Sequence, residues 1–170
     1  MAKIIKNCVI AAPGFDRKQN YDILISQGKI KEIAGDIALD GAAVIDVKGA
    51  AVMPGFIDMH CNVCEPGFEH MEDIETASMS AAKGGFTTIT CEPNTNPTID
   101  NKTVVEYIIS KSKTFSLVNI MPYGSVSIGC KGDELTDIGS MDRGGIIGLS
   151  DGGESIENAN FLKMCIRDSC

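Results

Sequence analysis

The chain has 170 residues, of which 44% are hydrophobic, and a formal net charge of −8. This length predicts about one domain, and the apolar content and six prolines exclude a disordered chain. The negative charge argues against a nucleic-acid-binding surface. No apolar run reaches the roughly 18 residues of a membrane span, and residues 1–7 lack the apolar core of a signal peptide. We therefore expect a cytoplasmic protein.

Residues 1–50 contain four short runs rich in β-forming residues. Breaks at Pro13-Gly14, Gln27-Gly28 and Asp40-Gly41 separate these runs. Four short strands are too few to close a barrel, so we expect a small antiparallel sheet, the strands of a small β-sandwich that precedes the main fold. The predicted strands are Ile4–Ala11, Asp22–Ser26, Lys29–Ala34 and Ala43–Val47.

From Ala51 onward the pattern changes, because predicted strands alternate with predicted helices. The strands are Val52–Met59, whose part after Pro54-Gly55 we expect to be buried, Phe86–Cys91, Phe115–Met121 and Gly145–Leu149. The helices are Glu72–Lys83, Asn101–Ser112 with Asp100 as its N-cap, Asp133–Met141, and one that begins at Glu157. Four strand-then-helix units in a row predict a parallel sheet with right-handed crossovers.

Two architectures contain such a sheet, a doubly wound sheet and a barrel. A doubly wound sheet favours a phosphate-binding loop, but neither G-x-G-x-x-G nor a Walker sequence occurs. A barrel predicts polar residues just after the strand ends. Such residues are present: His60, Asn62, Glu92, Asn94, Tyr123, Ser150 and Asp151. The prediction is therefore an α/β fold in which residues 51–163 form units one to four, the first half, of a TIM-like (β/α)8 barrel, since a full barrel needs about 250 residues.

His60 and Asn62 follow the first of these strands and are two residues apart, so an extended chain places them on one face. A His-x-His pair at a strand end is a compact metal-binding arrangement, and here Asn62 replaces the second histidine. His60 could also be a structural histidine, as we expect for His70. Asp151 could be a metal ligand or only a turn residue before Gly152.

The seven cysteines, without an export signal, predict free thiols in a reducing compartment. Buried structural thiols are the ordinary interpretation. Cys61 and Cys64 have the C-x-x-C spacing of some metal or redox pairs, and Cys91 could supply a third thiolate. Strand geometry argues against this alternative, because it turns Cys61 away from the face that carries His60.

Several motifs, in order along nearly the whole chain, resemble those of the dihydroorotases of the amidohydrolase superfamily. They are Val52–His60, Glu65–His70, Gly84–Thr88, Pro93–Pro97 and Leu149–Gly152. The resemblance implies a metal-dependent cyclic amide hydrolase that interconverts dihydroorotate and carbamoyl aspartate in pyrimidine synthesis. Members of the family hold one or two zinc ions with a His-x-His pair, an Asp after strand four and two later histidines, and use an Asp after strand eight as general base.

The resemblance implies that His60 and Asp151 are metal ligands and that Asn94 binds the substrate carboxylate. Asn62 and Cys64 stand where the family has its second histidine and a substrate-binding arginine, and Gly152 replaces a second aspartate. An amide oxygen is a poor zinc ligand beside imidazole, and a lost arginine removes bidentate recognition of a carboxylate. The later ligands and the general base would follow residue 170, so we expect no catalytic residue within these residues and no activity from them alone.

An alternative is a non-catalytic dihydroorotase homologue that serves as a structural partner of aspartate carbamoyltransferase. For either function, the full-length protein is expected to be a homo-oligomer with no nucleic acid or membrane partner. Met164–Ser169 is what the codons ATG-TGT-ATA-AGA-GAC-AG specify, which resembles a transposon end used as a sequencing-library adaptor. We therefore expect residues 164–170 to be a non-native tail.

Overall fold

The computed structural model describes residues 2–168, and its internal contacts divide the chain into two compact units. The first unit is Met1–Pro54 and the second is Gly55–Cys170. Ala51 and Val52 pair with the first strand of the chain, and they therefore belong to the first unit. None of the helices within residues 2–168 is long and apolar enough to cross a membrane.

The first unit is a five-stranded sheet with the order β3-β2-β1-β4, and β5 also pairs with β1. Its strands are β1 (Lys3–Ile10), β2 (Tyr21–Ser26), β3 (Lys29–Ala34), β4 (Ala43–Asp46) and β5 (Ala51–Val52). The pairs β1–β2 and β2–β3 are antiparallel, but β4 and β5 run parallel to β1. The predicted antiparallel sheet is therefore wrong in part, because the chain crosses from β3 at one edge to the far side of β1 before β4 begins.

The first unit has its own small core, which is built on Cys8, Ile10 and Ile23. The buried Asp22 carboxylate accepts backbone hydrogen bonds from Asn7 and Ile37, at 3.0 Å each. These bonds attach the segment after β3 to the sheet.

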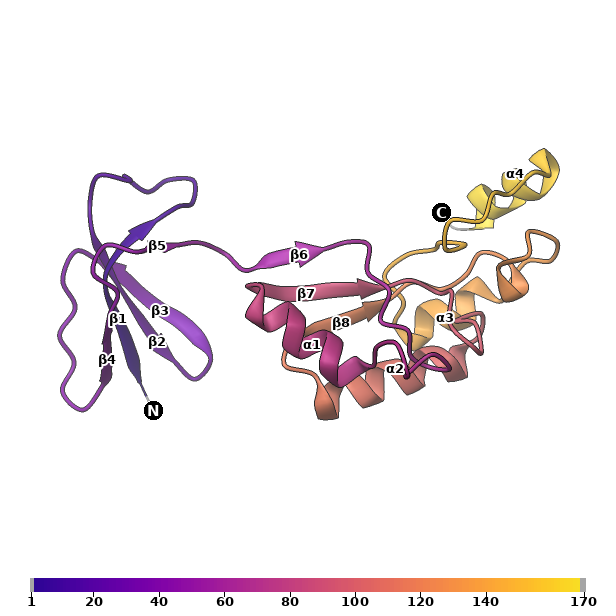
Figure 1. Ribbon diagram of the computed structural model, residues 1–170. Helices are drawn as coiled ribbons and strands as arrows, with labels where there is room; N and C mark the ends of the chain where they lie inside the picture. Colours follow the sequence, from indigo (N-terminus) through magenta and orange to yellow (C-terminus); the bar gives the residue numbers. More distant parts are fainter. Residues whose placement is uncertain (1, 169–170) are drawn as a thin grey trace. The chain divides into compact units, whose positions relative to one another are not determined.

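The second unit contains a parallel sheet with the order β6-β7-β8 (Figure 1). Its strands are β6 (Phe56–Asp58), β7 (Phe86–Cys91) and β8 (Asn119–Pro122). Its helices are α1 (Ile74–Lys83), α2 (Lys102–Phe115), the short 3-10 helix η1 (Ile128–Cys130), α3 (Ile138–Gly144) and α4 (Ala159–Asp168). The predicted parallel arrangement is thus confirmed for the first three strands.

The predicted strand Val52–Met59 is wrong as a single element, and its part after Pro54-Gly55 is not buried as expected. Pro54-Gly55 separates β5, which pairs with β1, from β6, which pairs with β7. Phe56 and Ile57 are 51% and 64% exposed, so β6 is not a buried strand. Proline cannot donate a ladder hydrogen bond, and this divides the run at the break.

The predicted strand Gly145–Leu149 is reduced to a single parallel bridge between Gly124 and Leu149. Around this bridge, the Gly124 N–H donates to the Gly148 carbonyl at 3.1 Å, and the Gly124 carbonyl accepts from the Ser150 N–H at 3.0 Å. The segment therefore continues the parallel order beyond the end of β8, although it is too short to count as a strand.

Helices α1 and α2 begin later than predicted, because the residue that caps each helix lies further along the chain than expected. Helix α1 begins at Ile74 because Asp73 forms a capping box with Thr76, and α2 is capped by Asn101 rather than by Asp100. In both helices, the cap accepts hydrogen bonds from backbone N–H groups of the first turn that have no partner inside the helix.

Two later boundaries also differ. Phe115, predicted to open a strand, is the last residue of α2, and β8 begins only at Asn119. Helix α3 begins at Ile138 because Asp137 caps it, so the residues from Asp133 are not helical. Helix α4 continues through residues 164–168 of the expected tail, whereas residues 169 and 170 lie outside the described residues.

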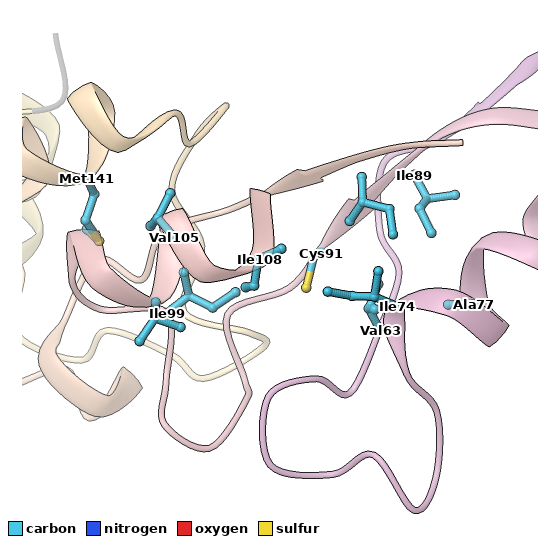
Figure 2. Close-up of a cluster of buried hydrophobic side chains, with 11 residues drawn as sticks. Val63, Ile74, Ala77, Ile89, Cys91, Ile99, Val105, Ile108 and Met141 are labelled. Atoms are coloured by element: carbon cyan, nitrogen blue, oxygen red, sulfur yellow. The ribbon is translucent and has the colours of Figure 1, made fainter. Parts of the chain in front are cut away.

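One face of the parallel sheet is covered by α1 packed on β7 and α2 packed on β8 (Figure 1). The side chains between these layers form the main core, part of which Figure 2 shows. The core consists of Val63, Ile74, Ala77, Ile89, Cys91, Ile99, Val104, Val105, Ile108, Ile120 and Met141. Parallel strands with helices on one face are consistent with part of a barrel.

Candidate functional site

Polar residues follow the carboxyl ends of neighbouring parallel strands in the second unit. His60 follows β6, Glu92 follows β7 directly, and Ser150 follows the bridge residue Leu149. Because carboxyl ends of parallel strands meet at one edge, loops after them can form a common site. The structure brings these three side chains into contact.

Glu92 joins the other two residues through its two carboxylate oxygens. The Nδ1 atom of His60 lies 3.1 Å from Oε1 of Glu92, and the Ser150 hydroxyl donates to Oε2 at 2.7 Å. The Glu92 side chain is only 4% exposed, whereas the His60 side chain is 75% exposed. The arrangement is therefore a buried carboxylate that contacts one ring nitrogen of a solvent-exposed imidazole.

Backbone contacts fix this geometry. The Asp58 carboxylate accepts a hydrogen bond from the His60 N–H at 3.0 Å, which stabilises the turn that follows β6. The Glu92 N–H donates to the carbonyl of Cys61 at 3.1 Å. The ends of β6 and β7 are thus tied together at the point where His60 and Glu92 leave the sheet.

Asp151 is buried, and its carboxylate accepts hydrogen bonds from the loop after β8. Its Oδ1 accepts from the N–H groups of Val126 and Ser127, at 2.8 and 3.0 Å, and its Oδ2 accepts from the Ser127 hydroxyl at 2.6 Å. These three bonds give Asp151 a structural part in holding that loop beside the fourth segment. A ligand role for Asp151 stays a prediction.

Asn94 is exposed and lies at the same end of the sheet. A Cβ atom built on Gly152 would lie 3.1 Å from the Cβ of Asn94, so the loop after β7 touches the turn after the fourth segment. Asn62 is also exposed, in the loop that follows His60. The substrate-binding role of Asn94 stays a prediction.

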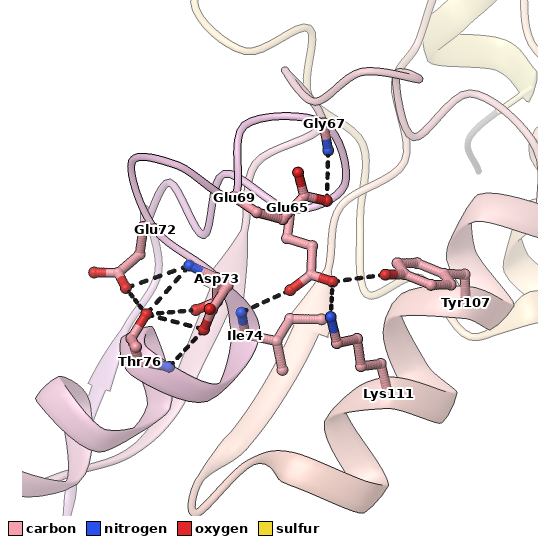
Figure 3. Close-up of polar contacts among 9 residues, drawn as sticks. All are labelled: Glu65, Gly67, Glu69, Glu72, Asp73, Ile74, Thr76, Tyr107 and Lys111. Carbon is pink, nitrogen blue, oxygen red and sulfur yellow. Dashed lines mark hydrogen bonds and ion pairs between the residues drawn. The ribbon is translucent and has the colours of Figure 1, made fainter.

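The loop between β6 and α1 is anchored by Glu65, which is fully buried (Figure 3). Its carboxylate accepts from the Ile74 N–H at 2.9 Å and the Tyr107 hydroxyl at 2.6 Å, and it forms an ion pair with Lys111. Burial raises the pKa of Glu65, but the bonds from Ile74, Lys111 and Tyr107 outweigh burial and lower it overall. Glu65 therefore holds the loop that carries Asn62 and Cys64.

The sequence did not lead us to assign a role to Glu65. Glu92 and Ser150 were expected to follow strand ends, but neither was given a role. The available signal was the position of Glu92 directly after a β-branched strand, where side chains face the carboxyl end of the sheet. The contact partners of both glutamates are distant in sequence, which a local pattern does not predict.

The described residues do not form a complete zinc site. Within residues 2–168, no group of three or more His, Cys, Asp or Glu side chains is placed to hold a metal ion. His60 supplies one imidazole, the amide of Asn62 is a poor zinc ligand, and the carboxylate of Asp151 already accepts three hydrogen bonds. This donor set by itself does not fit the zinc centre that the resemblance implies.

The three-thiolate alternative is wrong for the described chain. Cys61, Cys64 and Cys91 do not make a metal-binding group among residues 2–168. Burial raises the pKa of Cys91 to about 12 and also raises the pKa of Cys61, as is typical of thiols in apolar surroundings. Cys91 is part of the hydrophobic core (Figure 2).

Solved structures define the class of fold. An L-hydantoinase (dihydropyrimidinase) from Arthrobacter aurescens matches 99% of this chain and 38% of its own, with a TM-score of 0.81 and 24% sequence identity. A D-hydantoinase matches 75% of this chain and 28% of its own, with a TM-score of 0.63 and 33% identity. The chain therefore has the fold of the matched part of these two hydantoinases.

The profile of the family described as Dihydro-orotase-like matches residues 49–169, and the chain belongs to this family. Curated relatives include the dihydroorotases of Caldicellulosiruptor saccharolyticus, 45% identical over 165 residues, and Acetivibrio thermocellus, 43% identical over 166 residues. These matches cover 96% and 98% of this chain, but only 38% and 39% of the relatives. The chain thus spans well under half the length of these relatives.

Proposed function

We propose that the whole protein opens and closes a cyclic amide ring in pyrimidine synthesis, interconverting dihydroorotate and carbamoyl aspartate. The proposal is supported by membership of the Dihydro-orotase-like family and by relatives that are named dihydroorotase. The structural observation that carries it is the convergence of His60, Glu92 and Ser150 at the carboxyl end of the parallel sheet. In barrel enzymes, catalytic residues come from the ends of several strands at this face.

In the ring-opening direction, water adds to the ring carbonyl carbon, the carbon–nitrogen bond breaks, and the ring nitrogen takes a proton. The exposed amide of Asn94 would bind the substrate carboxylate, and His60 would present a ring nitrogen to the reacting groups. The proposal assigns no step to zinc, because His60 is the one imidazole that the described residues bring to this site. Localisation in the cytoplasm and a homo-oligomeric state belong to the same proposal.

The test is turnover of dihydroorotate and of carbamoyl aspartate by the purified whole protein. His60→Ala and Asn94→Ala should each lower kcat/KM, and the Asn94 change should cost about 10- to 100-fold because a bond to a charged group contributes about 1.5–3 kcal/mol. Asn20→Ala, at an exposed asparagine of the first unit, is the control and should leave turnover unchanged. Turnover that is insensitive to both site changes would refute the assignment.

A second candidate is a non-catalytic homologue that binds aspartate carbamoyltransferase. It is favoured by Asn62 and Cys64, which stand at the positions of the family's histidine and arginine. Size-exclusion chromatography of the two purified proteins, together and apart, separates the candidates when it is read beside the turnover assay. A stable complex without turnover supports the second candidate, and turnover without a complex supports the first.

A further inference from the structure

We propose that Glu92 is a positioning residue that fixes the tautomer of His60, so that Nδ1 carries the proton and Nε2 offers its lone pair to the site. The inference rests on the proposed function, because it names the residue that aims the imidazole of that same site. Neither the family match nor the relatives assign a role to Glu92.

The first step is the contact itself. Nδ1 of His60 lies 3.1 Å from Oε1 of Glu92, within hydrogen-bond distance. An ionised carboxylate can only accept hydrogen bonds, whereas a neutral imidazole has one N–H donor and one acceptor nitrogen. The ring nitrogen that faces Glu92 must therefore be the donor, and the other nitrogen is left as the acceptor.

The second step is the orientation of the carboxylate. The Ser150 oxygen accepts from the Gly152 N–H at 3.1 Å, and its own hydrogen is directed to Oε2 of Glu92 at 2.7 Å. Ser150 therefore holds one oxygen of the carboxylate and leaves the other for His60. The turn after the fourth segment is in this way connected to the imidazole through Glu92.

The third step is the difference in burial. With 4% of its side chain exposed, Glu92 has little access to water that could replace its protein partners, so its loss of either hydrogen bond is costly. The His60 side chain is 75% exposed, so the other residues of the described chain cover little of it. Its orientation consequently depends on the bond to Glu92, and the nitrogen that it offers can accept a hydrogen bond from water or from a substrate amide.

The experiment is nitrogen NMR of the protein labelled with 15N-histidine, at alkaline pH where the rings are neutral. The His60 signals are assigned by their absence in His60→Asn, and His70 is the internal reference. We expect the wild-type His60 ring to carry its proton on Nδ1. Glu92→Gln should retain this tautomer, because the amide oxygen still accepts, whereas Glu92→Leu should lose it and leave His70 unchanged.

Glu106→Gln, at an exposed glutamate on α2, is the matched control and should leave both histidines unchanged. A wild-type His60 ring protonated on Nε2, or an unchanged ring in folded Glu92→Leu, would overturn the inference. The wild-type spectrum decides the question even where the leucine variant fails to fold. Because the readout needs no turnover, failure of the proposed function leaves this result unaffected, and a wrong tautomer leaves the turnover assay unaffected.

Discussion

Glu65 and Glu92 are buried carboxylates in neighbouring loops of the second unit, but their partners differ. Glu65 is balanced by the cation of Lys111 and by two neutral donors, and it holds a loop to two helices. Glu92 is contacted by a serine hydroxyl and by the exposed ring of His60. The first pattern stabilises the fold, and the second leaves the ring of His60 exposed.

Glu65→Ala should lower the free energy of unfolding by about 2–3 kcal/mol, because it leaves Lys111 and the first turn of α1 without their partner. The pKa of Glu65 is lowered in the folded state, so its contribution is present above the ordinary value near 4.5 and is lost as the pH falls through the lowered pKa. Urea denaturation at neutral and acidic pH measures both effects. Glu65→Gln should show less loss of stability on acidification than the wild type.

Glu106→Ala is the matched control for this measurement, since Glu106 forms an exposed i,i+4 pair with Lys102. Its effect should stay below about 0.5 kcal/mol at any pH. Equal effects of the two substitutions would show that burial of Glu65 contributes nothing.

These residue roles were the least predictable part of the site. Tyr107 and Lys111 lie 42 and 46 residues from Glu65 along the chain, so no local pattern connects them. The motif positions of His60 and Asn94 did place both at the correct end of the sheet. The hydrogen bonds of Asp151 were not predictable, because nothing in the sequence marks Val126 and Ser127 as its partners. They become partners only when the loop after β8 is folded.

At the scale of elements, the sequence predicted strands best where composition and breakers agree. Phe86–Cys91 was predicted with its observed bounds, because a β-branched run lies between a Gly-Gly pair and a proline. Gly145–Leu149 was over-predicted, because its apolar run resembles a strand although only one bridge forms. Helix starts were misplaced by one to five residues, since several adjacent residues could serve as N-cap.

The observed cap of α2 gives a direct test of one such start. The Asn101 side chain accepts from the N–H groups of Thr103 and Val104, at 3.0 and 3.2 Å. Asn101→Ala should therefore lower the free energy of unfolding by about 1 kcal/mol, whereas Asn101→Asp should preserve it. Thermal and urea denaturation measure the change, and an aspartate variant as unstable as the alanine variant would contradict the capping role.

Strands β6 and β7 offer a matched pair of isoleucines. Ile89 on β7 is 3% exposed and belongs to the main core, whereas Ile57 on β6 is 64% exposed. Ile89→Ala should cost about 2–5 kcal/mol, and Ile57→Ala should stay within about 0.5 kcal/mol. A large loss from Ile57→Ala would restore the buried strand that the sequence predicted.

At the scale of the whole molecule, the fold class was predictable because the alternation of strands and helices extends over more than a hundred residues. The parallel order β6-β7-β8 and the polar residues after the strand ends both follow from that alternation. The mixed pairing of the first unit was not predictable, because it depends on a connection that crosses the sheet. The family assignment agrees with the motifs, all but the first of which lie entirely in the second unit.

Under the proposed function, the carboxyl end of the parallel sheet is a dihydroorotase site, and we expect Asn62 and Cys64 to weaken it because they stand where the family resemblance implies a histidine and an arginine. Asn62→His adds an imidazole beside His60, and Cys64→Arg adds a bidentate partner for a carboxylate. A buried charge-assisted bond contributes on the order of 2–5 kcal/mol, which corresponds to roughly 30- to 5,000-fold in rate. Each single change should restore only part of the site.

The most direct test is the rate of dihydroorotate ring opening by the whole protein and by its single and double variants at these two positions. We expect the double variant to exceed the wild type by roughly 30-fold or more, and to exceed either single variant. A folded double variant no faster than the wild type would contradict this expectation.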